Sequence, residues 1–319
     1  MFVLNDNDYK VFEQIVGMTQ DKLHRTMSNL LRKKYSNILE TKDYIVAIGD
    51  IPIALVAHLD TVFKTPVTDL YYDKQKGVLF SPQGLGADDR AGVFAILQIL
   101  KTNLRPSIIL TTDEELGGIG ASILADTYSE CPIPGLKYLI ELDRRGSYDA
   151  VFYDCITEDF QEYIESFGFL RAKGSFSDIS FLMSAWDKCG VNLSIGYKDE
   201  HTYVETLNIS HMFATINKVK RMLMAKDIPD FTFQEEEYSR FWNMAVGTGL
   251  DFTAKCFKCG HVFSDYEVIP IKDKNGLTKF VCPDCVYEGI EWCQSCGEAF
   301  ETSGEQPINL CNTCLEAIV

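Results

Sequence analysis

Apolar residues recur at helical intervals near the start of the chain. Between residues 8 and 33 they are three or four positions apart, which places them along one face of a helix. The pattern predicts one or two amphipathic helices that cover a sheet. The residues of this face are Phe12, Ile15, Val16, Leu23, Met27, Leu30 and Leu31.

From residue 43 onward, short apolar runs alternate with stretches of helical pattern. The runs read YIVAIG, IPIALVAH, GVLF, PSIILTT, LKYLIEL, AVFYD and GVNLSIG, and the helical stretches begin near Asp89, Gly118, Glu158, Asp178 and Leu207. Such alternation is typical of α/β domains. We therefore expect a mixed, mostly parallel sheet with helices on both faces, which gathers ligands at the carboxyl ends of its strands.

Length and composition add a smaller unit to this picture. With 319 residues and 46% hydrophobic content, the chain has room for one full-sized domain and a smaller one. The helical pattern ends near residue 225, and a proline, an acidic cluster and a Gly-Thr-Gly follow. We expect the α/β domain at residues 1–228, a linker at 229–254 and a cysteine-rich domain at 255–319.

The charge balance of the chain disfavours polyanionic partners. A formal net charge of −16 disfavours binding to nucleic acid or to an anionic membrane surface. The N-terminal MFVLNDNDYK carries acids where a signal peptide carries basic residues, and no apolar run approaches the roughly 18 residues of a spanning helix. The sequence therefore predicts a cytoplasmic protein that contacts neither a membrane nor nucleic acid.

Histidine and acidic residues stand where predicted strands end or the following helices begin. Because these positions share one edge of the sheet, we expect the side chains to lie together. A single acid at such a position more often caps a helix, but the whole set indicates a metal site. It consists of His58 and Asp60 in AHLDTV, Asp88 in GLGADDRAG, Glu114 and Glu115 in TTDEELGG, Asp143 in ELDRRG, and His201 in DEHTYVE.

The chemistry of this set suits two divalent ions. Two imidazoles and several carboxylates can hold a pair of zinc-like ions, with one carboxylate bridging and a water molecule shared between them. Glu114 and Glu115 are adjacent and point in different directions. One of them can therefore bind metal while the other serves as a base toward the water.

The ordered motifs His-x-Asp, Gly-x-Asp-Asp-Arg-x-Gly, Asp-Glu-Glu, Asp and His resemble those of the co-catalytic dizinc exopeptidases. That clan includes leucyl aminopeptidase-like enzymes, peptidase T, carboxypeptidase G and the glutamyl aminopeptidase group. The resemblance covers about residues 40 to 225. It implies a zinc exopeptidase-like α/β fold and two catalytic zinc ions, with cobalt or manganese as possible replacements.

The resemblance also assigns roles to individual residues. It implies that Asp88 bridges the two ions, that His58 and Asp143 complete one site, and that Glu115 and His201 complete the other. Glu114 is implied to be the general base and Asp60 the partner that orients His58. The peptide bond between Asp88 and Asp89 is expected to be cis, as is typical of these families.

This chain departs from some of those families in one respect. Peptidase T and the glutamyl aminopeptidases carry an extra domain inserted into the catalytic one, whereas only 29 residues separate His58 from Asp88 here and only 57 separate Asp143 from His201. The catalytic unit therefore resembles the leucyl aminopeptidase type without a lid. A monomer with an open cleft is the expectation.

Three further residues near the predicted site have two interpretations each. Asp178, in GSFSDISFL, resembles an aspartate of the substrate-side loop of aminopeptidases, and it is equally placed to cap the following helix. Arg144 and Arg145 follow Asp143 and can bind a substrate carboxylate. Structural ion pairs are the favoured interpretation for both arginines.

Eight of the eleven cysteines form four CxxC pairs in the tail. CxxC is the spacing with which a tight turn presents two thiolates to one ion, so the pairs predict two structural zinc ions of four thiolates each. Neighbouring pairs would give successive zinc ribbons, which we favour, and alternate pairs would give a cross-braced module. The pairs are Cys256 and Cys259, Cys282 and Cys285, Cys293 and Cys296, and Cys311 and Cys314.

The tail carries little positive charge for a nucleic-acid binder. Residues 251–319 contain five Lys and no Arg against eleven Asp and Glu. Phosphate binding is therefore disfavoured, and a protein partner or a purely stabilising role is the better hypothesis.

Taken together, the motifs predict a cytoplasmic dizinc aminopeptidase that acts on short peptides. Two alternatives stay open. One is a deacylase or carboxypeptidase that uses the same site on N-acyl amino acids or peptides. The other is a non-catalytic scaffold that acts through its zinc-binding tail.

Overall fold

An eight-stranded sheet forms the centre of the first of two units, Met1–Glu236. The computed structural model describes residues 3–174, 176–235, 253–256, 258, 262–264, 269–272, 278–281, 290–292 and 299–301. The strand order is β1-β2-β6-β3-β7-β10-β8-β9. These strands are β1 (Ile38–Glu40), β2 (Tyr44–Ala47), β3 (Ile51–His58), β6 (Pro106–Thr111), β7 (Tyr138–Arg144), β8 (Asp149–Val151), β9 (Leu170–Ala172) and β10 (Cys189–Ser194).

The central strands of this sheet run parallel. The neighbours β6, β3, β7 and β10 are parallel to one another, as are β8 and β9. Antiparallel pairing joins β1 to β2, β2 to β6, and β10 to β8. The predicted α/β class with a mixed, mostly parallel sheet is therefore confirmed. Every residue of β2, β6 and β10 is buried, which fits a sheet covered on both faces.

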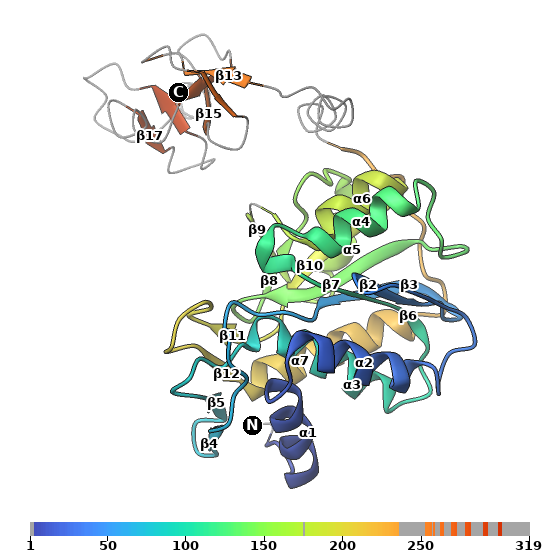
Figure 1. Cartoon of the computed structure of the whole chain (residues 1–319). Helices are drawn as coiled ribbons and strands as arrows, with labels where there is room; N and C mark the ends of the chain where they lie inside the picture. Colours follow the sequence, from blue (N-terminus) through green and yellow to red (C-terminus); the bar gives the residue numbers. More distant parts are fainter. Residues whose placement is uncertain are drawn as a thin grey trace. The chain divides into compact units, whose positions relative to one another are not determined.

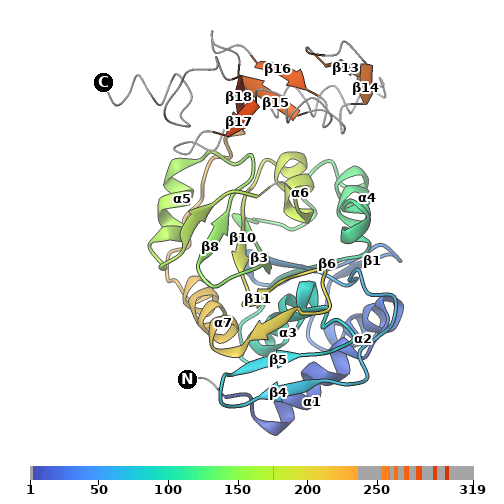
Figure 2. The same cartoon turned by 90° about the vertical axis from the view of Figure 1, so that its left-hand side faces the viewer.

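Helices cover both faces of the sheet (Figures 1 and 2). One side carries α1 (Asp6–Val16), α2 (Gln20–Leu31), α3 (Ala87–Leu100) and α7 (Ile209–Leu223). The other side carries α4 (Ile119–Thr127), α5 (Glu158–Glu165) and α6 (Asp178–Trp186). A short 3₁₀ helix, η1 (Glu114–Leu116), follows β6.

The N-terminal pattern gives two helices. Their predicted apolar faces are inside: Phe12, Leu23 and Met27 are buried. The side chains of Asn5 and Thr19 accept hydrogen bonds from the first-turn backbone of α1 and α2, which satisfies donors that a helix start leaves free.

Helix α3 lies inside the unit. All of its residues except Leu97 are buried, because it packs on β3 and β7 and also against α1 and α7. Asp88 and Asp89 have non-helical backbone angles at its start, and the peptide bond between them is cis. The expected cis bond is therefore confirmed.

A second, smaller sheet was not anticipated. The run GVLF forms a strand, but this strand pairs outside the main sheet, in the antiparallel order β11-β12-β5-β4. Residues 206–208 belong to this sheet, so α7 begins at Ile209, two residues after the start that was predicted near Leu207. The strands are β4 (Tyr71–Asp73), β5 (Val78–Phe80), β11 (Tyr197–Lys198) and β12 (Thr206–Asn208).

The second unit, Glu237–Val319, contains two further sheets. Their strands are β13 (Thr253–Lys255), β14 (Val262–Ser264), β15 (Ile269–Lys272), β16 (Thr278–Val281), β17 (Ile290–Trp292) and β18 (Ala299–Glu301). Of the eight CxxC cysteines, Cys256 is described and buried, and the other seven lie outside the described residues. The two structural zinc ions therefore stay a prediction. No helix in the described parts of the chain has the length and apolar content to cross a membrane.

Candidate metal centre

Three neighbouring parallel strands bring candidate residues to one edge of the main sheet. His58 is the last residue of β3, and Asp143 lies at the carboxyl end of β7. Glu114 and Glu115 open η1, which follows the carboxyl end of β6. The carboxyl ends of parallel strands point the same way, so these side chains share one region, as the sequence predicted.

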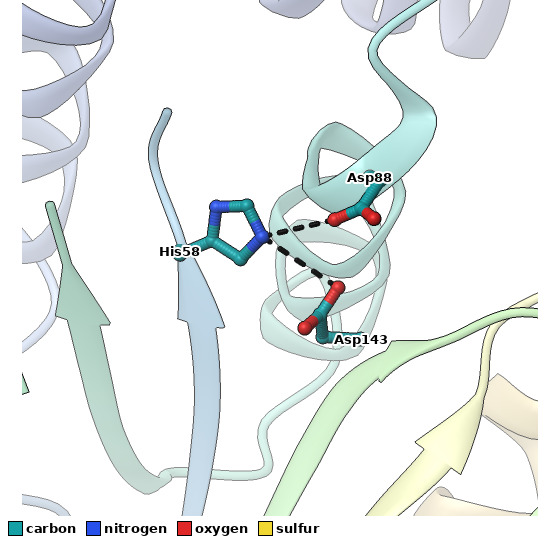
Figure 3. Close-up of side chains that lie close together, drawn as sticks. All are labelled: His58, Asp88 and Asp143. Atoms are coloured by element: carbon teal, nitrogen blue, oxygen red, sulfur yellow. Dashed lines mark hydrogen bonds and ion pairs between the residues drawn. The ribbon is translucent and has the colours of Figure 1, made fainter. Parts of the chain in front are cut away.

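A first group of candidate ligands surrounds the imidazole of His58 (Figure 3). The Nε2 atom of His58 lies 3.0 Å from Oδ1 of Asp88 and 3.6 Å from Oδ1 of Asp143. One potential ligand atom from each residue lies within 4.8 Å of the others. The His58 side chain is fully buried, so this group sits at the inner end of the site.

A second group uses the other oxygen of Asp88. The Nε2 atom of His201 lies 3.2 Å from Oδ2 of Asp88 and 3.0 Å from Oε2 of Glu115. His201 comes from the segment between β11 and β12, and its side chain is 48% exposed, so this group faces solvent. Asp88 thus offers one oxygen to each group, which is the arrangement required of a carboxylate that bridges two ions.

The carboxylates of the centre repel one another. Burial and the charge of Asp88 raise the pKa of Asp143 well above its ordinary value. The same two causes raise the pKa of Glu115 to about 7, and its Oε1 atom is buried without a hydrogen-bond partner among the described residues. Divalent cations would relieve this repulsion and engage the free oxygen, so the residues fit a pair of zinc-like ions.

Both histidines attract protons in this setting. The hydrogen bond with Asp88 raises the pKa of His201 to about 9. Burial opposes a charge on His58, but the carboxylates of Asp143, Asp60 and Asp88 outweigh burial and raise its pKa well above the ordinary value. A metal ion binds the neutral imidazole. Its binding must therefore release protons from these rings.

Asp60 connects the first group to η1. Its Oδ1 atom lies 3.1 Å from Nδ1 of His58 and accepts a hydrogen bond of 3.1 Å from the backbone N–H of Glu114. Its Oδ2 atom accepts a hydrogen bond of 3.0 Å from the backbone N–H of Glu115. A single carboxylate therefore contacts the imidazole of His58, the partner that the resemblance implied, and also holds the backbone of both glutamates, which the sequence did not predict.

The Glu114 carboxyl differs from that of Glu115 in having no partner of its own among the described residues. Burial raises the pKa of this carboxyl above its ordinary value. Within the described part of the chain, the carboxyl accepts no hydrogen bond and forms no ion pair, whereas Glu115 contacts His201. The two adjacent glutamates therefore differ in their contacts, as their opposite directions predicted.

The remaining candidates lie around this centre with partners of their own. Asp178, at the start of α6, is buried and accepts a hydrogen bond from the hydroxyl of Thr111. Its predicted role toward substrate stays a prediction. Arg145 pairs with Glu200 at 2.6 Å, and Arg144 lies 3.7 Å from Asp149, so the structural interpretation of the two arginines is supported.

Sequence reasoning missed two buried carboxylates that support the centre. The oxygens of Glu205 accept hydrogen bonds from the backbone N–H groups of Gly86 (2.6 Å) and Asp88 (3.0 Å). Asp89 accepts one from the backbone N–H of His58 at 3.3 Å. Both residues lie in stretches already singled out, GLGADDRAG and DEHTYVE. Spacing along the sequence does not tell whether an acidic side chain in such a stretch is buried or exposed to solvent.

Zinc binding at this centre should release protons. Because the pKa of His201 is raised to about 9, this ring carries a proton at pH 7, and Glu115, with a pKa of about 7, carries one in about half of the molecules; a bound ion would displace both. We expect the full chain to release about one proton more than an Asp88→Ala variant, and its zinc affinity to fall between pH 8 and pH 6. Calorimetric titration in two buffers of different ionisation enthalpy measures this difference. Equal proton release by the two proteins would contradict it.

Replacing Asp60 should weaken the centre without removing a ligand. All three contacts of Asp60 use its oxygens as acceptors, so the NH₂ group of an Asp60→Asn variant must face one donor. We expect zinc affinity to fall about 10-fold to 100-fold and the free energy of unfolding to fall by about 1–3 kcal/mol. Metal titration and denaturant unfolding test this. The exposed-residue control Asp126→Asn should change neither.

Known structures share this fold. No family model matches the chain, and no curated protein matches it. A tripeptidase from Staphylococcus aureus is 14% identical, with a TM-score of 0.53 over 68% of this chain and 97% of its own. A TET aminopeptidase from a marine sediment Thaumarchaeota archaeon is 11% identical, with a TM-score of 0.55 over 70% of this chain and 98% of its own. At the level of the fold, the chain is therefore similar to exopeptidases, as the motifs indicated.

Proposed function

We propose that the first unit is a metal-dependent exopeptidase, and more narrowly an aminopeptidase that acts on short peptides. One observation carries the proposal: Asp88 offers an oxygen to each of two ligand groups. The carboxyl of Glu114, which has no hydrogen bond or ion pair within the described residues, is near enough for the charges of His58 and Asp88 to act on its pKa. The likeness in fold to a tripeptidase and an aminopeptidase supports it.

The proposed ligands divide between two ions. His58 and Asp143 would hold one ion, Glu115 and His201 the other, and Asp88 both. Zinc suits these nitrogen and oxygen donors, and cobalt or manganese can take its place. When bound, such a pair activates a water molecule and polarises the carbonyl of the scissile bond.

Glu114 is the proposed general base. Its carboxyl would accept a proton from the attacking water and donate that proton to the leaving amine. The raised pKa brings this group closer to neutral pH, where it can both take and give a proton. Asp60 holds the backbone N–H of Glu114 and the imidazole of His58, so base and ligand keep a fixed spacing.

The tail has a separate proposed role. Its eight cysteines would bind two structural zinc ions, and metal binding would supply much of the folding free energy of so small a unit. The tail is acidic, which disfavours nucleic acid as its target. A protein partner is therefore the proposed target. This proposal rests on the CxxC spacing.

The aminopeptidase proposal makes a prediction about free amines and about Glu114. Metal-loaded protein should hydrolyse free di- and tripeptides and leave their N-acetylated forms intact. In a Glu114→Gln variant kcat should fall roughly 100-fold to 10,000-fold, because proton transfer is lost while the ligands remain. Quantified release of amino acids measures both effects.

The control for this experiment is Glu130→Gln, a change to an exposed glutamate that should leave kcat within twofold of the parent. Cleavage of the acetylated peptides would move the assignment to a deacylase or carboxypeptidase. Absence of turnover by protein with confirmed metal content would support the scaffold hypothesis.

A further inference from the structure

A cavity of about 480 Å³ opens beside the candidate centre. Asp60 and Glu115 belong to its wall, so a molecule held at the centre can extend into it. Most of the remaining wall comes from the α1–α2 connection, the loop after β3 and the residues before α3, and Asp113 and Leu116 also belong to it. Several side chains there are apolar, among them Val62, Val67, Leu85 and Leu116.

A buried arginine lines this cavity. Arg90 projects from the first turn of α3, and only 3% of its surface is exposed. Its Nη2 atom donates a hydrogen bond of 3.1 Å to the backbone oxygen of Met18. Its Nε and Nη1 atoms are buried and have no hydrogen-bond partner among the described residues. An arginine side chain stays charged in proteins, so donors of a buried cation are left unused.

No carboxylate of the described residues pairs with this cation. Asp60 and Asp89 attract it over a longer distance, but neither forms an ion pair with it. The oxygens of Asp60 already accept from His58, Glu114 and Glu115. Those of Asp89 accept from the backbone of His58 and Gly92. Buried charges in proteins are normally paired, and a carboxylate that enters the cavity would complete this one.

We propose that Arg90 is a specificity-determining residue that binds a carboxylate of the peptide substrate inside this cavity. The planar guanidinium matches a carboxylate through two parallel N–H bonds. The inference rests on the proposed peptidase function, and it narrows the substrate class to short peptides with a carboxylate close to the scissile bond. Two sources have this chemistry, namely the C-terminus of a di- or tripeptide and an acidic side chain.

Binding without turnover tests the subsite. The Glu114→Gln variant, loaded with zinc, would be titrated with five intact probes. These are trialanine, trialanine amide, and three amidated peptides in which glutamate replaces one alanine of trialanine amide at each position in turn. We expect at least one carboxylate probe to bind 10-fold or more tightly than trialanine amide. Preference for trialanine would identify the C-terminus as the source, and preference for an amidated glutamate peptide would identify the side chain. Equal affinities for all probes would overturn the proposal.

Second-site variants assign any preference to Arg90. In the Glu114→Gln background, Arg90→Met should reduce the preference to less than twofold, and Arg90→Lys should retain part of it because the cation remains. The matched control is Lys64→Met, which removes an exposed cation from the same cavity wall and should keep the preference. A preference that survives in Arg90→Met would refute the assignment. If Arg90→Met fails to fold, the Arg90→Lys comparison and the probe series still decide the outcome.

The two hypotheses fail in different ways. Absence of hydrolysis by the parent protein, together with Arg90-dependent binding of carboxylate probes, would reject the peptidase function and retain the subsite. Hydrolysis of peptides with a free C-terminal carboxylate at the same kcat/KM as their C-terminal amides, and as amides that contain glutamate, would reject the subsite and retain the peptidase function.

Discussion

The concentration of buried negative charge around Asp88 is the constraint on which the rest of the structure depends. Asp88 lies 3.0 Å from His58 and 3.2 Å from His201, through different oxygens. Hydrogen bonds from both imidazoles hold its pKa well below the ordinary value against burial. The neighbouring acids Asp143 and Glu115 instead show raised pKa values. Divalent cations would compensate this buried negative charge, so the residues of the centre fit metal binding.

The surrounding fold holds this charge in place. Parallel strands deliver His58 and Asp143 from neighbouring positions in the sheet, and the backbone of the Asp88 loop is tied to the buried carboxylate of Glu205. His201 arrives from the small second sheet, whose strands pair residues 78–80 with 206–208. The centre therefore draws on segments next to both sheets, and the ligand group that contains His201 is open to solvent.

Sequence patterns predicted much of this arrangement and missed the rest for physical reasons. His58, Asp143 and the two glutamates stand at or just after the ends of β3, β7 and β6, so their convergence followed from the parallel order of these strands. The small sheet escaped notice because its strands have two or three residues each. Arg90 and Glu205 were missed because spacing does not tell whether a charged side chain turns inward, a question that tertiary packing decides.

Whether Asp88 bridges two ions can be seen in an anomalous-scattering crystal structure of the zinc-loaded full chain, recorded on both sides of the zinc absorption edge. We expect two peaks at the centre, each within coordination distance of a different oxygen of Asp88, with His58 beside one and His201 beside the other. A single peak, or none next to Asp88, would contradict the claim that this carboxylate bridges two ions.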